Sequence, residues 1–326
     1  MDLDEQRARA HVAVIGAGAM GTGIAQVAAA AGHPVSLVDA GPGAAAAAIA
    51  RLAATLERLV GKGRLAPEEA TAILSRLQTV SSITDLPECG LVIEAVPEVL
   101  DLKQRIFTEV AQHQPATTLL ATNTSSLDIG AIAEPVPDPE RVLGLHFFNP
   151  PPVMRLVEVI HAATTSEAYL RHATLMMTHW GKTPVQCAST PGFIVNRVAR
   201  PFYGEAQRIV ESGVADAATV DWILRERGGF PMGPLELTDF IGQDVNLAVG
   251  TSVWQQTGRD ERYAPTGLQQ SLVAAGTLGR KSGAGIYRYA ADGARIVPDP
   301  DLGLAERLVG GPIATDPLAR TIAMLV

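Results

Sequence analysis

A glycine-rich turn near the N-terminus constrains the fold of this chain most. Gly16, Gly18 and Gly21 form a G-x-G-x-x-G pattern between the apolar run 11–15 and the alanine-rich segment 19–31. Between a strand and a helix, such glycines permit a tight turn, a close approach of the backbone to a pyrophosphate and close helix–strand packing. We therefore expect a dinucleotide-binding fold. A glycine-rich turn without a ligand is the weaker alternative.

An acidic residue follows at the distance that this motif requires. Asp39 lies 18 positions after Gly21 and ends the apolar run 35–38. A carboxylate there accepts hydrogen bonds from ribose hydroxyls and repels a 2′-phosphate, which favours NAD over NADP. The first amides of the predicted helix, at Ala19 and Met20, would face the phosphates. The alternative for Asp39 is a solvated residue at a strand end.

Apolar runs and amphipathic segments alternate along the first half of the chain. Further runs that resemble buried strands occupy residues 91–96, 118–121, 142–145 and 156–160, and helical segments occupy 44–60 and the stretch that begins at Pro67. This alternation is typical of a parallel sheet that is covered on both faces. We predict an α/β fold, with a Rossmann-type doubly wound parallel sheet in residues 1–189.

The pattern changes near residue 190, after which helical periodicity dominates. We predict an all-helical domain over residues 190–289, which would bind substrate and dimerise. Residues 290–303 are rich in Gly, Pro and Asp, as linkers are. The apolar segment 316–326 resembles the start of a second helical domain that is cut short. Residues 290–326 are therefore expected to hold a linker and that truncated start.

Charge and cysteine content exclude several classes of function. The formal net charge of −8 argues against nucleic acid or an anionic membrane as a partner. No apolar run is long enough to span a membrane, and the acidic N-terminus does not resemble an export signal. Cys89 and Cys187 have no metal-type spacing, so we expect no metal site and a cytoplasmic location.

Two polar residues stand in or directly after apolar runs, where they are costly unless they are paired. His146 follows the run 142–145, and Glu158 lies inside the run 156–160. If the two residues pair, the carboxylate fixes the imidazole tautomer, and the histidine is a candidate general base. The alternatives are a core histidine bonded to backbone and a glutamate on a solvated face.

Further candidates are less specific. The polar run 122–126, which contains Ser125, follows another predicted strand, but it is also an ordinary helix cap. Asn196 lies among apolar residues at the start of a predicted helix and needs partners. Lys62 belongs to a basic group on or after the helix 44–60, which suits a phosphorylated ligand but is also typical of a solvated face. Arg155 is a candidate partner for a distal substrate carboxylate.

Taken together, these segments closely resemble the L-3-hydroxyacyl-CoA dehydrogenases. The resemblance covers about residues 10–289 and is carried by residues 16–23, 123–127, 144–150, 156–160, 191–197, 230–234 and 279–283. It implies that His146 is the general base and that Glu158 orients it. It also implies that Ser125 binds the reacting oxygen and that Asn196 positions the substrate.

The same resemblance implies the ligand contacts. The positions expected to contact NAD are Gly16, Gly18, Ala19, Met20, Gly21, Asp39, Glu98, Lys103, Asn149 and Lys281. Those expected to contact coenzyme A are Thr55, Lys62 and Ser125. The family fold, a Rossmann domain with a helical domain that dimerises, implies a homodimer.

The residues 196–203 and 235–246 most resemble a subgroup that oxidises 3-hydroxyadipyl-CoA in phenylacetate breakdown. Relatives in that subgroup are usually longer. Two alternatives to 3-hydroxyacyl-CoA oxidation remain at this point. One is a sugar-acid dehydrogenase of the L-gulonate type on the same scaffold, and the other is a redox-inactive dinucleotide-binding protein.

Overall fold

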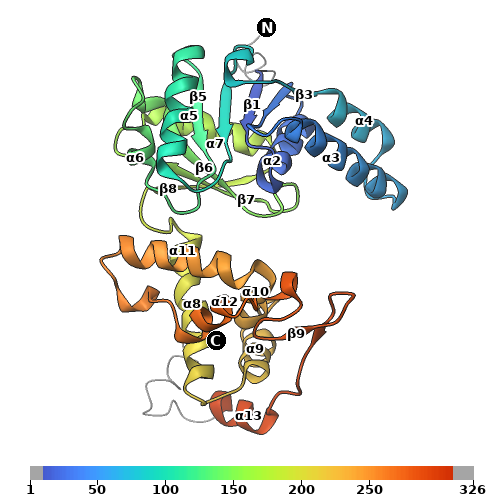
Figure 1. The fold of residues 1–326 in the computed structure, drawn as a ribbon, viewed down its shortest axis with the longest axis vertical. Coiled ribbons are helices and arrows are strands. Elements are labelled where there is room, and N and C mark those ends of the chain that lie inside the picture. Colours follow the sequence, from blue (N-terminus) through green and yellow to red (C-terminus); the bar gives the residue numbers. More distant parts are fainter. Residues whose placement is uncertain (1–9, 311–326) are drawn as a thin grey trace. The chain divides into compact units, whose positions relative to one another are not determined.

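A computed structural model describes residues 10–310 and divides the chain into two compact units (Figure 1). Unit 1 comprises Met1–Phe193 and unit 2 comprises Ile194–Val326. The expected start of a second helical domain, residues 316–326, lies outside the described residues, as does the acidic N-terminal segment 1–7.

Unit 1 is built on one eight-stranded sheet. Its strands, in the order β3-β2-β1-β4-β5-β6-β7-β8, are β3 (Leu77–Thr79), β2 (Val35–Val38), β1 (Val12–Ile15), β4 (Leu91–Glu94), β5 (Leu119–Thr122), β6 (Val142–Phe147), β7 (Leu156–His161) and β8 (Thr183–Ala188). Short apolar and β-branched runs suit the inner strands of this sheet, because both of their faces are covered, whereas the edge strands β3 and β8 are largely exposed.

The sheet is mixed, whereas the sequence predicts a parallel one. All neighbouring strands are parallel except β6 and β7, which are antiparallel. The physical reason is the short connection between them, residues 148–155. An antiparallel neighbour can be reached through such a loop, but a parallel neighbour needs a long crossover.

Helices cover both faces of this sheet, as the predicted doubly wound fold requires. One core contains Val12 and Val14 of β1 and packs against α2 (Ala19–Ala30), α3 (Ala44–Gly61), α4 (Pro67–Ser75) and α7 (Glu167–His179). The other contains Ala13 and Ile15 and packs against α5 (Leu100–His113) and α6 (Ile129–Ala133). Two short 3₁₀ helices, η1 (Ile83–Asp85) and η2 (Pro139–Arg141), lie in the connections. Alternate residues of one strand thus serve opposite cores.

The direction of strand addition reverses beside β1. After β3 the chain crosses to β4, on the other side of β1. In open α/β sheets, ligands bind at such a reversal, outside the carboxyl ends of the strands. The segments that follow β1, β2, β4, β5 and β6 therefore meet at the edge where a ligand is expected.

Unit 2 is helical, as predicted, apart from one small hairpin. Its elements are α8 (Val195–Glu211), α9 (Ala217–Glu226), α10 (Pro234–Ile241), α11 (Gln243–Gln256), η3 (Glu261–Tyr263), α12 (Gly267–Ala274), η4 (Arg280–Ser282), β9 (Arg288–Tyr289), β10 (Arg295–Ile296) and α13 (Leu302–Gly310). The core of this unit contains Ile209, Ile223 and Leu235.

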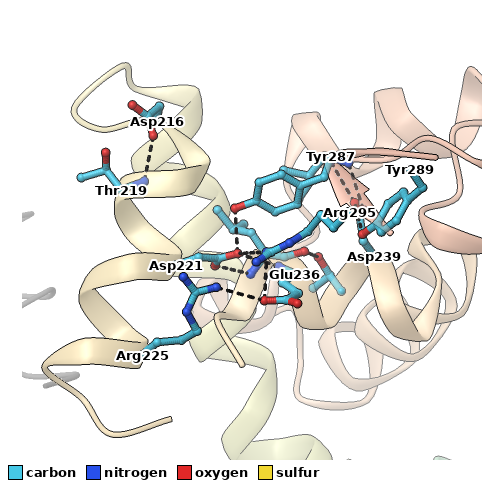
Figure 2. Close-up of polar contacts among 12 residues, drawn as sticks. Asp216, Thr219, Asp221, Arg225, Glu236, Asp239, Tyr287, Tyr289 and Arg295 are labelled. Carbon is cyan, nitrogen blue, oxygen red and sulfur yellow. Dashed lines mark hydrogen bonds and ion pairs between the residues drawn. The ribbon is translucent and has the colours of Figure 1, made fainter. Parts of the chain in front are cut away.

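Two buried aspartates tie the segment around β9 to the helices (Figure 2). Asp239 accepts hydrogen bonds from the backbone N–H groups of Ile286 and Tyr287, both at 2.9 Å. Asp221 accepts one from the Tyr287 hydroxyl at 2.8 Å and one from the Leu235 amide at 2.9 Å. Burial raises the pKa of Asp221, although these bonds oppose the shift.

The segment 290–303 is not the linker that its composition predicts. Arg295, in β10, forms an ion pair with Glu236 at 2.9 Å, and the Asp301 amide donates to the Thr219 hydroxyl at 2.8 Å. Ala305 of α13 is buried against the core of unit 2. These tertiary contacts hold residues 290–310 on unit 2.

Candidate active site

The glycine turn has the geometry that a pyrophosphate site needs. Gly16 has a φ of +107°, which favours glycine. A Cβ on Gly21 would lie 1.8 Å from the Gly16 carbonyl oxygen, so no larger residue fits there. Gly18 is exposed, and a Cβ on it would meet nothing within 4 Å. The helix α2 starts after Gly18 with no side chain capping its first amides.

Asp39 borders this turn at the end of β2. Its carboxylate accepts hydrogen bonds from the Ala17 amide at 2.7 Å and the Gly41 amide at 2.9 Å. The uncapped amides at Ala19 and Met20 and the open space at Gly18 suit a phosphate, and Asp39 suits a ribose hydroxyl. The residues present therefore fit a dinucleotide such as NAD.

His146 and Glu158 form the pair that the sequence predicts. They stand opposite each other in the register of the antiparallel strands β6 and β7, and residues opposite each other in such a pair have neighbouring side chains. Nδ1 of His146 lies 2.6 Å from Oε2 of Glu158. Both residues are buried.

This contact determines what the imidazole can do. When Nδ1 carries the proton that it donates to Glu158, Nε2 is the nitrogen that can accept another proton. The carboxylate also stabilises the imidazolium that results. The rings of Phe148 and Phe193 lie 4.6 and 5.8 Å from the imidazole, between centroids. Glu158 and these rings together restrict its rotation.

Ser125 is held by Glu98 at the same edge of the sheet. An oxygen of Glu98 accepts from the Ser125 amide at 2.6 Å and from its hydroxyl at 3.0 Å. Lys103 forms an ion pair with the other oxygen at 3.2 Å. Burial opposes ionisation of Glu98, but the charge of Lys103 and the bonds from Ser125 and Thr124 outweigh it and hold its pKa below the usual value.

Glu94, at the end of β4, is a buried part of this cluster that the sequence analysis missed. Its carboxylate accepts hydrogen bonds from Lys103 at 2.7 Å, the Thr122 hydroxyl at 2.7 Å and the Val96 amide at 2.6 Å. The sequence contains a signal for it, because Glu94 is a lone glutamate at the end of the apolar run 91–94. Burying its carboxylate without a partner would cost as much free energy as burying that of Glu158.

The other site residues predicted in unit 1 are exposed or only partly buried. Asn149 follows β6 and is exposed. Thr55 lies on α3, where its hydroxyl donates to the Arg51 carbonyl at 2.9 Å. Lys62 is exposed just after the end of the same helix, and the basic side chains around it, Arg51, Arg58 and Arg64, are exposed too. These positions are compatible with contact to a phosphorylated ligand.

Two predicted site residues belong to unit 2. Asn196 is the second residue of α8, and its side-chain oxygen accepts from Arg200 at 3.3 Å. Lys281, in η4, forms an ion pair with Asp244 at 2.5 Å. Within residues 10–310, no three His, Cys, Asp or Glu side chains are grouped so that they could hold a metal ion. No helix of that range is long and apolar enough to cross a membrane.

A doubly wound sheet, a glycine turn shaped for a pyrophosphate and a buried His–Glu pair at one sheet edge define the class of dinucleotide-dependent dehydrogenases. Comparison with known families narrows this class. Residues 11–190 match the family model "3-hydroxyacyl-CoA dehydrogenase, NAD binding domain", and residues 192–289 match "3-hydroxyacyl-CoA dehydrogenase, C-terminal domain". The chain belongs to the 3-hydroxyacyl-CoA dehydrogenase family.

Curated relatives agree with this assignment. The chain is 50% identical over 286 residues to 3-hydroxyadipyl-CoA dehydrogenase of Escherichia coli. The aligned region covers 88% of this chain and 60% of the relative. It is 40% identical over 276 residues to a probable 3-hydroxybutyryl-CoA dehydrogenase of Deinococcus radiodurans. That aligned region covers 85% of this chain and 99% of the relative. The chain thus spans about three fifths of the first relative and nearly all of the second.

Solved structures give the same result. A 3-hydroxybutyryl-CoA dehydrogenase from Escherichia coli matches with a TM-score of 0.84 and 50% identity, over 86% of this chain and 59% of that one. The (S)-3-hydroxybutyryl-CoA dehydrogenase from Ralstonia eutropha matches with a TM-score of 0.83 and 36% identity, over 86% of this chain and 99% of that one.

Proposed function

We propose that this protein oxidises an (S)-3-hydroxyacyl-CoA to the 3-oxoacyl-CoA with NAD. The observation that carries the proposal is the buried contact of 2.6 Å between His146 and Glu158, at the sheet edge that also holds the glycine turn. When bound, NAD supplies the acceptor for the hydride that leaves C3 of the substrate.

The residues of the chain supply the proton chemistry. Nε2 of His146 takes the proton of the 3-hydroxyl group, while Glu158 holds the ring through Nδ1 and stabilises the imidazolium. When substrate is bound, the Ser125 hydroxyl donates to the reacting oxygen instead of to Glu98, and Glu98 keeps the serine in place through its backbone amide. Asn196 binds the substrate near its thioester.

The remaining residues bind the two nucleotide portions. The NAD contacts are assigned to Gly16, Gly18, Ala19, Met20, Gly21, Asp39, Glu98, Lys103, Asn149 and Lys281. The contacts to coenzyme A are assigned to Thr55, Lys62 and Ser125. The exposed cations beside Lys62 support the second assignment, because the substrate carries phosphates.

The substrate class is tested by the NADH that the purified protein forms. It is given NAD with 3-hydroxybutyryl-CoA, 3-hydroxyadipyl-CoA or L-gulonate, and absorbance at the NADH band is followed. We expect NADH with one or both acyl-CoA substrates and none above background with L-gulonate. Oxidation of L-gulonate alone, or of none of the three, contradicts the proposal.

We also propose a homodimer that forms through unit 2 and works in the cytoplasm. Large apolar side chains exposed on unit 2, among them Val198, Phe240 and Val245, support self-association. Sedimentation velocity tests the dimer, and a monomer at tens of micromolar protein contradicts it.

The proposed location is supported by the two free cysteines, Cys89 and Cys187, which suit a reducing compartment. Fractionation of the source cells tests the location.

A further inference from the structure

A small polar pocket in unit 2 has no role in the activity proposed above. It lies between α8, α11 and the segment that contains η3 and the start of α12, and it is small and partly open to solvent. Its polar lining comes from Arg200, Gln207, Asn246, Tyr263, Thr266 and Gln269. Most of these side chains are buried, although they come from a helical core that is otherwise apolar.

The pocket contains a cation without a matching anion. Arg200 donates to the Asn246 side-chain oxygen at 3.0 Å, to its backbone carbonyl at 3.2 Å and to the Asn196 side-chain oxygen at 3.3 Å. All three acceptors are neutral. Within residues 10–310, no carboxylate lies within ion-pair distance of Arg200. Burial lowers the pKa of this guanidinium, so the fold bears a cost for holding it charged.

Two donors in the same pocket also have no acceptor. The Nε of Arg200 is buried without a hydrogen-bond partner, and so is the Nε2 of Gln207. The Gln207 side-chain oxygen is already engaged by the Thr266 hydroxyl at 2.7 Å, which orients the amide. Buried donors without partners are uncommon, and each one calls for an acceptor.

The missing partner is best matched by a carboxylate. The Tyr203 ring, whose centroid lies 4.9 Å from the guanidinium carbon, offsets only part of the charge of Arg200. A single water molecule satisfies donors but supplies no anion, whereas a carboxylate supplies two acceptor oxygens and one negative charge. The position of the pocket beside Asn196 indicates that this carboxylate belongs to the substrate. Asn196 and Arg200 are four residues apart on α8, so they lie on the same face, about 6 Å apart along the axis.

We propose that Arg200, with Gln207 beside it, binds the distal carboxylate of an ω-carboxylated 3-hydroxyacyl-CoA. This inference rests on the proposed function, in which Asn196 binds the substrate near its thioester. An acyl chain of about six carbons has a length comparable to one turn of helix, so its far end reaches Arg200. A pocket of this kind selects dicarboxylic substrates over simple fatty acyl chains of equal length, because an uncharged chain end leaves the donors unpaired.

The test compares two substrates that differ only at the far end of the chain, 3-hydroxyadipyl-CoA and 3-hydroxyhexanoyl-CoA. For the unaltered protein we expect kcat/KM to favour the adipyl substrate by at least roughly 10-fold. In Arg200→Met, kcat/KM for the adipyl substrate is expected to fall roughly 10- to 100-fold. The value for the hexanoyl substrate is expected to change by less than about 3-fold.

Two further variants complete the test. Arg227→Met removes an exposed arginine of the same unit and is expected to leave both values unchanged. Gln207→Leu keeps the cation but removes one donor, and it is expected to lower only the adipyl value, by roughly 3- to 10-fold. This variant and the preference of the unaltered protein keep the proposal testable if Arg200→Met does not fold.

The outcomes separate this inference from the proposed function. If the unaltered protein oxidises both substrates equally well, the pocket holds only water and the inference is wrong. The inference is also wrong if Arg200→Met lowers both values in parallel, or if Arg155→Met alone shows the selective loss. If no 3-hydroxyacyl-CoA is oxidised at all, the proposed function itself fails.

Discussion

Each buried carboxylate in the candidate site of unit 1 has a specific partner. Glu158 contacts the imidazole of His146, and Glu94 accepts from Lys103, Thr122 and a backbone amide. An unpaired buried charge costs roughly several kcal/mol, and a well-placed partner with further hydrogen bonds offsets part of that cost. These contacts therefore fix the groups in place before any ligand arrives, which lowers the reorganisation that the proposed proton transfer needs.

The first prediction concerns the base. In His146→Gln, kcat for NADH formation is expected to fall about 10²- to 10⁴-fold, because the amide cannot take the hydroxyl proton. Glu158→Gln is expected to lower kcat as well, since a neutral amide stabilises an imidazolium poorly. The dissociation constant for NAD, measured by fluorescence titration, should stay within about twofold in both variants.

The control is Glu109→Gln, which makes the same change on the exposed side of α5 and should leave kcat unchanged. Normal turnover by purified His146→Gln would refute the assignment of the base. A large loss of NAD affinity in that variant would indicate a misfolded sheet edge rather than a missing base.

Sequence reasoning identified His146 and Glu158 as a pair because each is a lone polar residue in an apolar context. It did not find Glu94, although the same argument applies to it, and it did not find Arg200. Arg200 has polar neighbours that come from α11, far along the chain. Partners of this kind are set by packing between elements, and the local pattern of one helix does not contain them.

Among the elements of unit 1, the strands found from sequence are those with both faces buried. The runs at β1, β2, β4, β5, β6 and β7 were predicted from their apolar composition, with small differences at the ends. The strands β3 and β8 were missed, because β3 has only three residues and β8 is largely exposed. The antiparallel direction of β7 was also missed, since a strand's composition does not record which way it runs.

The second prediction concerns the turn between β1 and α2 and uses two equal substitutions. Gly21→Ala forces a Cβ against the Gly16 carbonyl, so it is expected to lower the free energy of unfolding by roughly 1–3 kcal/mol. Gly18→Ala adds a methyl group in open space and should cost less than about 1 kcal/mol. Urea denaturation measures both values.

The same pair separates folding from binding. The methyl group in Gly18→Ala occupies the approach to the uncapped amides of α2, so NAD affinity is expected to fall at least about 10-fold while the fold is kept. Isothermal titration measures this affinity. Unchanged affinity in Gly18→Ala, or unchanged stability in Gly21→Ala, would show that the turn does not have the role assigned to it.

On the scale of the whole molecule, residues 290–310 show how tertiary contacts override composition. Their Gly, Pro and Asp content is typical of a linker, yet Arg295 and Ala305 attach them to unit 2. The attachment depends on Asp221 and Asp239, which hold the neighbouring segment around β9. The composition of this segment does not reveal the attachment, because the partners lie 47 to 82 residues away in the chain.

The third prediction tests this attachment. Asp239→Asn places an amide donor against the donors at Ile286, Tyr287 and Tyr289, and it is expected to destabilise unit 2 by roughly 1–3 kcal/mol. Hydrogen exchange followed by mass spectrometry should show faster exchange in residues 285–296, whereas β1 of unit 1 keeps its protection.

Asp299→Asn is the matched control, since Asp299 is exposed in the same region. It is expected to leave the exchange of residues 285–296 unchanged. Equal protection of that segment in Asp239→Asn and in the unaltered protein would mean that the buried aspartate does not hold β9 in place.

The antiparallel return of β7 along β6 has a practical consequence. Glu158 and His146 lie on two strands that are joined by one loop, and the hydrogen bonds between β6 and β7 set the spacing of the two side chains. Residues 150–155 of the joining loop can therefore be changed in protein engineering without separating the two groups, provided that Phe148 and Asn149 are kept. The same holds in evolution, because residues 150–155 can diverge while the proposed proton acceptor and its carboxylate are inherited together.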